Sequence, residues 1–200
     1  MKTISYLYIS IISFFLFFFL TIFIINGNHI FFDDSIYNFL RTFSLTSFFQ
    51  VITNFGSAYV IVPVVILTFL LEKKKNYRYL FLALVLLNTV ANLVLKLFFG
   101  RSRPIYERLT DASGFSFPSG HAMASVICYG LLIYLLWQLK ISKILKIIGT
   151  GLCLFLIISI SLSRIYLGVH YASDVLGGIL ASLFFLNFGL FFFETTKKKA

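Results

Sequence analysis

Charged residues are scarce in this chain of 200 residues, and acidic residues are the scarcest. Asp, Glu, Lys and Arg together make up 12% of the sequence, whereas 60% is hydrophobic and the mean hydropathy is +0.96. A water-soluble domain needs far more polar surface than this to cover its core, so soluble classes of protein are excluded. We therefore expect the lipid bilayer to be the solvent of an all-α protein.

Cysteine and polar linker sequence are also nearly absent. Cys128 and Cys153 both fall in apolar stretches and lack the spacing of metal ligands, so we interpret them as small core residues. The loops outside the membrane likewise contain no carboxylate or Cys/His cluster with metal-ligand spacing, and we predict no metal and no cofactor. The sequence contains no internal repeat and no low-complexity linker. Residues 1–200 are therefore predicted to form one membrane-embedded domain.

Long apolar runs are abundant. Crossing a hydrocarbon layer of roughly 30 Å takes about 20 helical residues. Six stretches meet this length and are predicted to span the membrane: Thr3 to Ile25, Val51 to Leu71, Leu80 to Phe99, Ser119 to Leu139, Ile147 to Ser163, and Ser173 to Phe193. The first is too long for a signal peptide and no cleavage pattern follows it, so we interpret it as a retained span.

One amphipathic stretch lies between the first two predicted spans. In Asp33 to Gln50, apolar residues recur at helical spacing beside Asp34, Asn38 and Arg41. We expect this stretch to be a helix that lies in the membrane interface.

The basic residues predict the orientation of the chain. One side of the membrane receives eleven of them: Lys2, Lys73, Lys74, Lys75, Arg78, Lys140, Lys143, Lys146, Lys197, Lys198 and Lys199. The other side receives six: Arg41, Lys96, Arg101, Arg103, Arg108 and Arg164. By the positive-inside rule, both termini are predicted to be cytoplasmic. The net charge of +10 is spread over short clusters, so we expect contact with membrane lipids and not with nucleic acid.

Titratable residues gather at three places that this topology puts on the extracytoplasmic face. Charges at membrane depth are costly, so each one needs a partner. The places are the end of the third span, with Lys96 and then Arg103, the start of the fourth, with Ser119 to His121, and the segment from the end of the fifth span into the sixth, with Arg164, His170 and Asp174. Singly, each has an ordinary explanation, such as a lysine that snorkels to the interface. Together they predict a phosphate site.

The start of the fourth predicted span suits an anion. Pro118 at a first helical turn costs no hydrogen bond, so the backbone N–H groups of Ser119 and Gly120 would be free to face a ligand. The Ser119 hydroxyl adds a donor and Gly120 permits close approach. Three cations are predicted to complete the site: Lys96, Arg103 and Arg164. Their charge suits the transition state of phosphoryl transfer.

Two histidines are assigned different roles by their spacing. His170 and Asp174 are four residues apart and would share a face of a helix, so the carboxylate could hold one ring nitrogen while the other attacks phosphorus. His170 is therefore the predicted nucleophile. His121 has no such carboxylate and is predicted to protonate the leaving oxygen and then to activate water. His29 has no comparable neighbours.

These residues resemble the type 2 phosphatidic acid phosphatase superfamily, whose pattern is K-x6-RP, PSGH and SR-x5-H-x3-D. The chain matches every fixed position: Lys96, Arg103, Pro104, Pro118, Ser119, Gly120, His121, Ser163, Arg164, His170 and Asp174. The resemblance implies a metal-independent lipid phosphatase of six transmembrane helices. Its implied substrate is a lipid phosphate such as phosphatidylglycerophosphate, phosphatidic acid or undecaprenyl diphosphate.

Three alternatives stay open at this point. A haloperoxidase could use the same phosphate cradle for vanadate, although the six spans argue against a soluble relative. A lipid-binding or transport protein could keep the fold without catalysis. A phosphotransferase could pass the phosphate to an acceptor other than water. The oligomeric state is not specified by the sequence.

Overall fold

A computed structural model describes residues 2–25 and 30–198, and each regular element in these ranges is a helix. In chain order they are α1 (Lys2–Ile25), α2 (Phe32–Arg41), α3 (Thr46–Ile52), the 3-10 helix η1 (Thr53–Gly56), α4 (Ala58–Leu71), α5 (Lys75–Phe99), α6 (Gly120–Gln138), α7 (Lys143–Tyr166) and α8 (Ala172–Lys197). The predicted all-α class is confirmed for the described residues. His29 and Lys199 lie outside them.

Within residues 2–25 and 30–198, five helices are long and apolar enough to cross a membrane, namely α1, α5, α6, α7 and α8. The second predicted span is not one uninterrupted helix. Its residues fall on the end of α3, on η1 and on α4, with a bend of 43° at a break around Ser57. Helix α4 has 14 residues, fewer than the roughly 20 that a crossing requires, so a sixth span exists only if the bent pair is taken as one.

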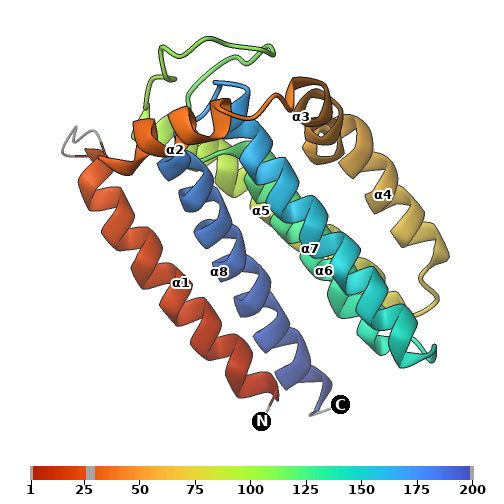
Figure 1. Cartoon of the computed structure of the whole chain (residues 1–200). Helices are drawn as coiled ribbons and strands as arrows, with labels where there is room; N and C mark the ends of the chain where they lie inside the picture. The colour runs from red at the N-terminus through yellow and green to blue at the C-terminus, as the bar shows by residue number, and fades with distance from the viewer. Residues whose placement is uncertain (1, 26–29, 199–200) are drawn as a thin grey trace.

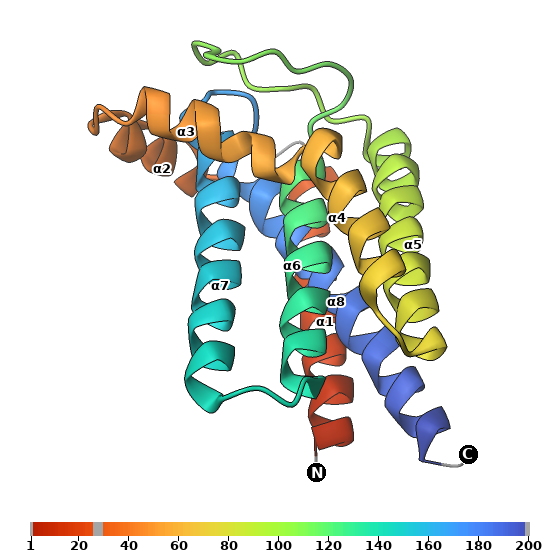
Figure 2. The same cartoon turned by 90° about the vertical axis from the view of Figure 1, so that its right-hand side faces the viewer.

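Helix α6 lies at the centre of the bundle, where it contacts α5, α7 and α8 (Figures 1 and 2). Helix α1 packs along α8 on the outside. Helix α1 carries exposed Phe15, Phe18 and Phe23, as expected for a helix that faces lipid. The apolar surface of α1 therefore agrees with the bilayer as solvent.

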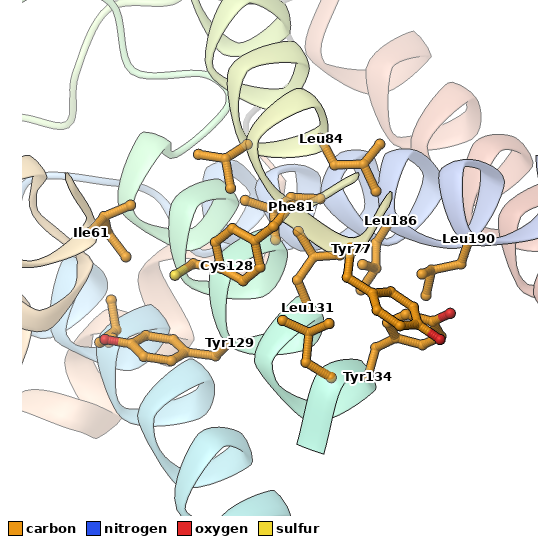
Figure 3. Close-up of a cluster of buried hydrophobic side chains, with 14 residues drawn as sticks. Ile61, Tyr77, Phe81, Leu84, Cys128, Tyr129, Leu131, Tyr134, Leu186 and Leu190 are labelled. Atoms are coloured by element: carbon orange, nitrogen blue, oxygen red, sulfur yellow. The ribbon is translucent and has the colours of Figure 1, made fainter. Parts of the chain in front are cut away.

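The largest hydrophobic cluster joins α5, α6 and α8 (Figure 3). Phe81 of α5 and Leu131 of α6 are almost fully buried in it, beside Leu186 of α8. Cys128 is fully buried in the same cluster, as expected for a small core residue. Close packing at this depth fixes the three helices whose far ends carry the motif residues.

The two ends of the bundle differ in content. The beginning of α1 and the end of α8 lie together at one end (Figures 1 and 2). The opposite end carries α2, α3 and the segment 100–119, which cross over the tips of the long helices. The predicted single helix over Asp33 to Gln50 is wrong in detail, because the helical structure stops after Arg41 and resumes at Thr46.

Two glycines in the left-handed region turn the chain into the motif segments. Gly100, with φ 55°, ends α5 one turn after Lys96, and its N–H donates to the Lys96 carbonyl at 3.0 Å. Gly168, with φ 71°, follows α7 and leads into His170. A Cβ on Gly168 would lie 2.2 Å from the Glu107 carbonyl oxygen, so only glycine fits there.

Candidate active site

The three motif segments converge at the end of the bundle that carries α2 and α3. Helix α5 brings Lys96, α6 begins at Gly120 beside His121, and the turn between α7 and α8 brings His170. His121 interacts electrostatically with Arg164, His170, Arg103 and Lys96, which places it among all of them. The structure therefore brings together the residues that the sequence predicted for one site.

The His170–Asp174 pair is formed, but not for the predicted reason. The Nδ1 atom of His170 lies 3.3 Å from Oδ2 of Asp174, and both side chains are buried. His170 lies before the first residue of α8, Ala172, so the two do not share a helical face. Asp174 instead occupies the first turn of α8, where its Oδ2 accepts from the Tyr171 N–H at 2.9 Å. The irregular turn, and not helical periodicity, brings His170 to the carboxylate.

His170 is held in the neutral form. The pKa of His170 is lowered to about 4, chiefly because burial disfavours the charged ring; Asp174 opposes the shift, and the nearby Arg164 and Arg103 add to it. With Nδ1 facing the carboxylate, Nδ1 carries the proton and Nε2 keeps its lone pair. The Nε2 atom lies 3.3 Å from a guanidinium nitrogen of Arg103. A neutral imidazole with a free Nε2 is the form that a nucleophile requires.

Two of the three cations are engaged with backbone carbonyls of the segment before α6. Lys96 donates to the carbonyls of Phe115 and Ser116. Arg103 donates to the carbonyls of Ser113 at 2.6 Å and Gly114 at 3.0 Å, and also to that of Val169. These carbonyl oxygens occupy positions around the cations that the oxygens of an anion could take.

Two buried donors at the site have no protein partner. Arg164 is 4% exposed and donates from its terminal nitrogen to Thr53 at 2.6 Å, but its Nε is unpartnered. The hydroxyl of Ser119 is fully buried and also unpartnered. Among the described residues one further buried side-chain atom is in this state, Ser161 Oγ on α7. Buried donors are nearly always satisfied in native proteins, so these two point to a ligand.

The start of α6 differs from the expected anion cradle in two respects. Pro118 precedes the N-cap residue Ser119 and is not the first helical residue. The backbone N–H of Ser119 is not free, because it donates to the Asp174 carbonyl at 3.0 Å. The contact is close because α8 has Gly178 here, where a Cβ would lie 2.8 Å from the Ser119 carbonyl oxygen. Ser119 therefore offers its hydroxyl, and not its backbone N–H, to a ligand.

Helix η1 closes the site beside His121. A Cβ on Gly56 would lie 2.6 Å from Ile160 and 3.2 Å from the ring of His121, so glycine lets this turn approach α6 and α7 closely. The adjacent Thr53 is the residue that binds Arg164. The break in the second span thus supplies a wall of the site, which a continuous helix would not.

Sequence reasoning missed three residues that contact Asp174 or its neighbours. Ser116 donates to Asp174 Oδ2, and Arg101 donates to Oδ1 at 2.7 Å. Asp33, in α2, forms an ion pair with Arg101 at 3.3 Å. Arg101 had a signal, since it is a charge inside the K-x6-RP interval. Asp33 stands 140 positions before Ser173, which it also contacts, and no local pattern connects the two.

Metal ligands do not cluster in the part of the chain that the structure describes. No group of three or more His, Cys, Asp or Glu side chains there could hold a metal ion. The site's charge is instead dominated by Lys96, Arg103 and Arg164, whose chemistry favours an anion with several oxygens.

The family model described as the PAP2 superfamily matches residues 76–198. Phosphatidylglycerophosphatase B from Bacillus subtilis (strain 168) is 34% identical over 145 residues, which cover 68% of this chain and 70% of that protein. An undecaprenyl-diphosphatase from Sulfolobus acidocaldarius is 28% identical over 149 residues, covering 72% of this chain and 68% of that protein.

Two solved structures share the fold. The crystal structure of a transmembrane PAP2-type phosphatidylglycerolphosphate phosphatase from Bacillus subtilis superposes with a TM-score of 0.81 and 26% identity, covering 96% of this chain and 97% of the other. Aquifex aeolicus LpxE superposes with a TM-score of 0.65 and 24% identity, over 79% and 94% of the two chains. The second match supports the fold alone.

Proposed function

This chain belongs to the PAP2 superfamily of membrane phosphatases, and from that premise we propose that it hydrolyses a lipid phosphomonoester or diphosphate at the outer membrane face. Phosphatidylglycerophosphate is the first substrate to test, because a relative and a solved structure that resemble the chain bear that activity in their names. Undecaprenyl diphosphate is the second, on the same ground. Phosphatidic acid is the third, by the family resemblance.

One observation carries the proposal. The hydroxyl of Ser119 and the Nε of Arg164 are buried donors without a partner, in the cluster that also contains His170. A phosphoryl group offers several oxygens to such donors. Lys96 and Arg103 would exchange backbone carbonyls for phosphate oxygens, at little cost in hydrogen bonds. Five groups would then surround one phosphate: Lys96, Arg103, Ser119, Gly120 and Arg164.

The first chemical step uses the free nitrogen of His170. Its Nε2 lone pair forms a bond to phosphorus while the bond from phosphorus to the leaving lipid oxygen breaks. His121 gives a proton to that oxygen, so that the lipid leaves as an alcohol or a lipid phosphate. Asp174 stabilises the positive charge that the imidazole ring acquires, through Nδ1.

The second step returns the enzyme to its starting form. His121, now the base, takes a proton from a water molecule whose oxygen attacks the phosphohistidine. The bond from phosphorus to Nε2 breaks, inorganic phosphate leaves and His170 is neutral again. No step needs a metal ion or a cofactor, so we propose a metal-independent reaction with water as acceptor.

The location of the site follows from the charge asymmetry. The site lies at the end of the bundle opposite the described end of α8, which carries Lys197 and Lys198. If the lysine-rich end is cytoplasmic, both termini are cytoplasmic and the site faces outward in a multi-pass protein of the cell membrane. Cysteines introduced near Asp111 should be labelled from outside intact cells, and cysteines near Lys74 only after permeabilisation.

The experiment that tests the proposed function is phosphate release by the purified protein in detergent. The panel contains phosphatidylglycerophosphate, phosphatidic acid, undecaprenyl diphosphate and a soluble phosphomonoester, each with a His170→Ala control. We expect release from at least one lipid, faster than from the soluble ester. Equal release by wild type and variant would contradict the proposal. Addition of glycerol or another alcohol tests transfer, because a phosphotransferase would form the new ester at the expense of phosphate.

A further inference from the structure

A second carboxylate is connected to Asp174 through Arg101. Asp33 of α2 is fully buried. Its Oδ1 accepts from the Ser173 backbone N–H at 2.8 Å, and its Oδ2 accepts from the Ser173 hydroxyl at 2.8 Å. Asp33 therefore ties α2 to the residue that immediately precedes Asp174.

Arg101 lies between the two carboxylates. One terminal nitrogen donates to Asp174 Oδ1 at 2.7 Å and to the Ser173 hydroxyl at 2.8 Å, and the other donates to Asp33 Oδ2 at 3.3 Å. Its guanidinium also stacks over the Tyr171 ring, 4.2 Å from the centroid. The side chain is 14% exposed, so these contacts are only weakly screened by solvent.

The two oxygens of Asp174 have separate tasks as a result. Oδ2 faces His170, the Tyr171 N–H and the Ser116 hydroxyl, whereas Oδ1 accepts a hydrogen bond from Arg101. A carboxylate held at both oxygens has one orientation. A small misplacement of a group that orients a nucleophile is costly in rate, so this second anchor has a consequence for catalysis.

We propose that Arg101 and Asp33 are positioning residues for the His170–Asp174 pair, a role that rests on the proposed function. Arg101 anchors Asp174 Oδ1 so that Oδ2 stays directed at His170, and Asp33 holds Arg101 and the Ser173 backbone in place. Arg101 acts through Asp174, because its side chain contacts Asp174, Ser173, Asp33 and Tyr171, none of which is a proposed phosphate ligand. Its removal should therefore change the rate of the chemical step and not the binding of substrate.

The test compares Arg101→Ala, Arg101→Lys and Asp33→Asn with the wild type on the best lipid of the panel. We expect Arg101→Ala to lower kcat by roughly 10- to 100-fold with KM within about twofold, as when the outer partner of a ligating histidine is removed. Arg101→Lys keeps the charge and should recover part of kcat. Asp33→Asn should also lower kcat, because the amide has one acceptor oxygen and cannot accept from both Arg101 and the Ser173 backbone N–H.

A pH profile separates positioning from a loss of folding. The charged and titratable groups that face His170 are Asp174, Arg164, Arg103 and His121. Loss of the Arg101 cation leaves the negative charge of Asp174 uncompensated, so the proton on His170 is held more firmly. The acid limb of kcat/KM should then move to higher pH in Arg101→Ala, but not in Arg101→Lys or Asp33→Asn.

Arg41→Ala is the matched control. Arg41 pairs at the surface with Glu107, 69% exposed, and should leave kcat and the acid limb unchanged. If Arg101→Ala does not survive purification, the size-conserving Arg101→Lys and Asp33→Asn carry the test. Wild-type kcat in both, or a rise in KM at constant kcat, would overturn the positioning role alone. An inactive wild type would overturn the proposed function and this role with it.

Discussion

The two sides of His170 are built differently. On the Nδ1 side, Asp174, Arg101, Asp33 and Ser173 satisfy one another in a closed network of buried hydrogen bonds. The phosphate-binding residues differ: Ser119 and Arg164 have buried donors without a protein partner, while Lys96 and Arg103, the latter 3.3 Å from Nε2, are bound to backbone carbonyls. A satisfied network gives a rigid support, whereas unsatisfied donors mark the position of a ligand. The contrast assigns support to one side of the ring and chemistry to the other.

The largest effect should come from the residue that both sides share. His170→Ala removes the nucleophile, so no phosphohistidine can form and lipid phosphate release should fall to background. Thermal unfolding in detergent should show that the variant is folded. Release above background by a folded His170→Ala protein would contradict the assignment of the nucleophile.

His121→Ala should have the next largest effect, because it removes the acid and the base but leaves the nucleophile. With a lipid leaving group, activity should drop by about 10² to 10⁴, the usual contribution of general acid–base catalysis. An activated leaving group such as p-nitrophenolate needs little protonation, so its first step should be partly rescued.

Acid-labile phosphate should then accumulate on the His121→Ala protein, because hydrolysis of the phosphohistidine still lacks a base. The same labelling of His170→Ala should give no signal. If phosphate instead accumulated on the His170→Ala protein, the roles of the two histidines would be reversed, and Asp174 would not mark the nucleophile.

Ser119→Ala tests the unsatisfied side directly. Losing one donor to the transition state should lower kcat/KM on the order of 10²-fold, while the stability of the protein should be unchanged because the hydroxyl has no protein partner. Ser125→Ala is the matched control, since the Ser125 hydroxyl is equally buried in α6 but bonds to the carbonyl of Ala122 at 3.0 Å. Equal activity of the two variants would remove Ser119 from the site.

The value of kcat/KM should change less with pH near neutrality than it would if the nucleophile were an exposed histidine. Because the pKa of His170 is lowered to about 4, its neutral form persists well below the ordinary value of 6.5. We expect the His170 limb of kcat/KM to lie near pH 4, with a fall of about tenfold per pH unit below it. If the acid limb of kcat/KM lay at pH 6 to 7 and were shown to come from His170, the buried, neutral state of this ring would be contradicted.

The free energy of unfolding should fall together with activity as the pH is lowered from about 6.5 to 4, so the two effects must be measured separately. In the unfolded chain His170 takes up a proton as the pH falls through about 6.5, whereas in the folded protein it does so only near 4. The unfolded state therefore binds more protons in this window, and the free energy of unfolding falls as the pH is lowered. Recovery of full activity on return to pH 7 distinguishes titration from irreversible unfolding.

Chelation should have the smallest effect of all. If the cations Lys96, Arg103 and Arg164 supply the positive charge of the site, EDTA should leave lipid phosphate release nearly unchanged. The measurement is the same release assay with and without chelator. If EDTA abolished activity and a divalent ion restored it, the site would need a metal, and the three cations would not be sufficient for phosphate binding.

The sequence by itself determined the membrane class, the all-helical architecture and the residues that meet at the site. These follow from local causes: apolar length sets the long helices, and the cost of charge in the bilayer requires that His121, His170 and Asp174 find partners. The alternation of the predicted spans likewise placed the three motifs at one end. Such features depend on composition and spacing, which a sequence displays directly.

Only the tertiary structure decided how the site is supported. The break at Ser57, the use of the Ser119 N–H by α8 and the link from Asp33 to Arg101 each depend on segments far apart in the chain. No periodicity connects Asp33 with Ser173, because their contact exists only after α2 has folded across the end of the bundle. Buried polar groups find whichever partners packing brings within reach, and that choice is made in three dimensions.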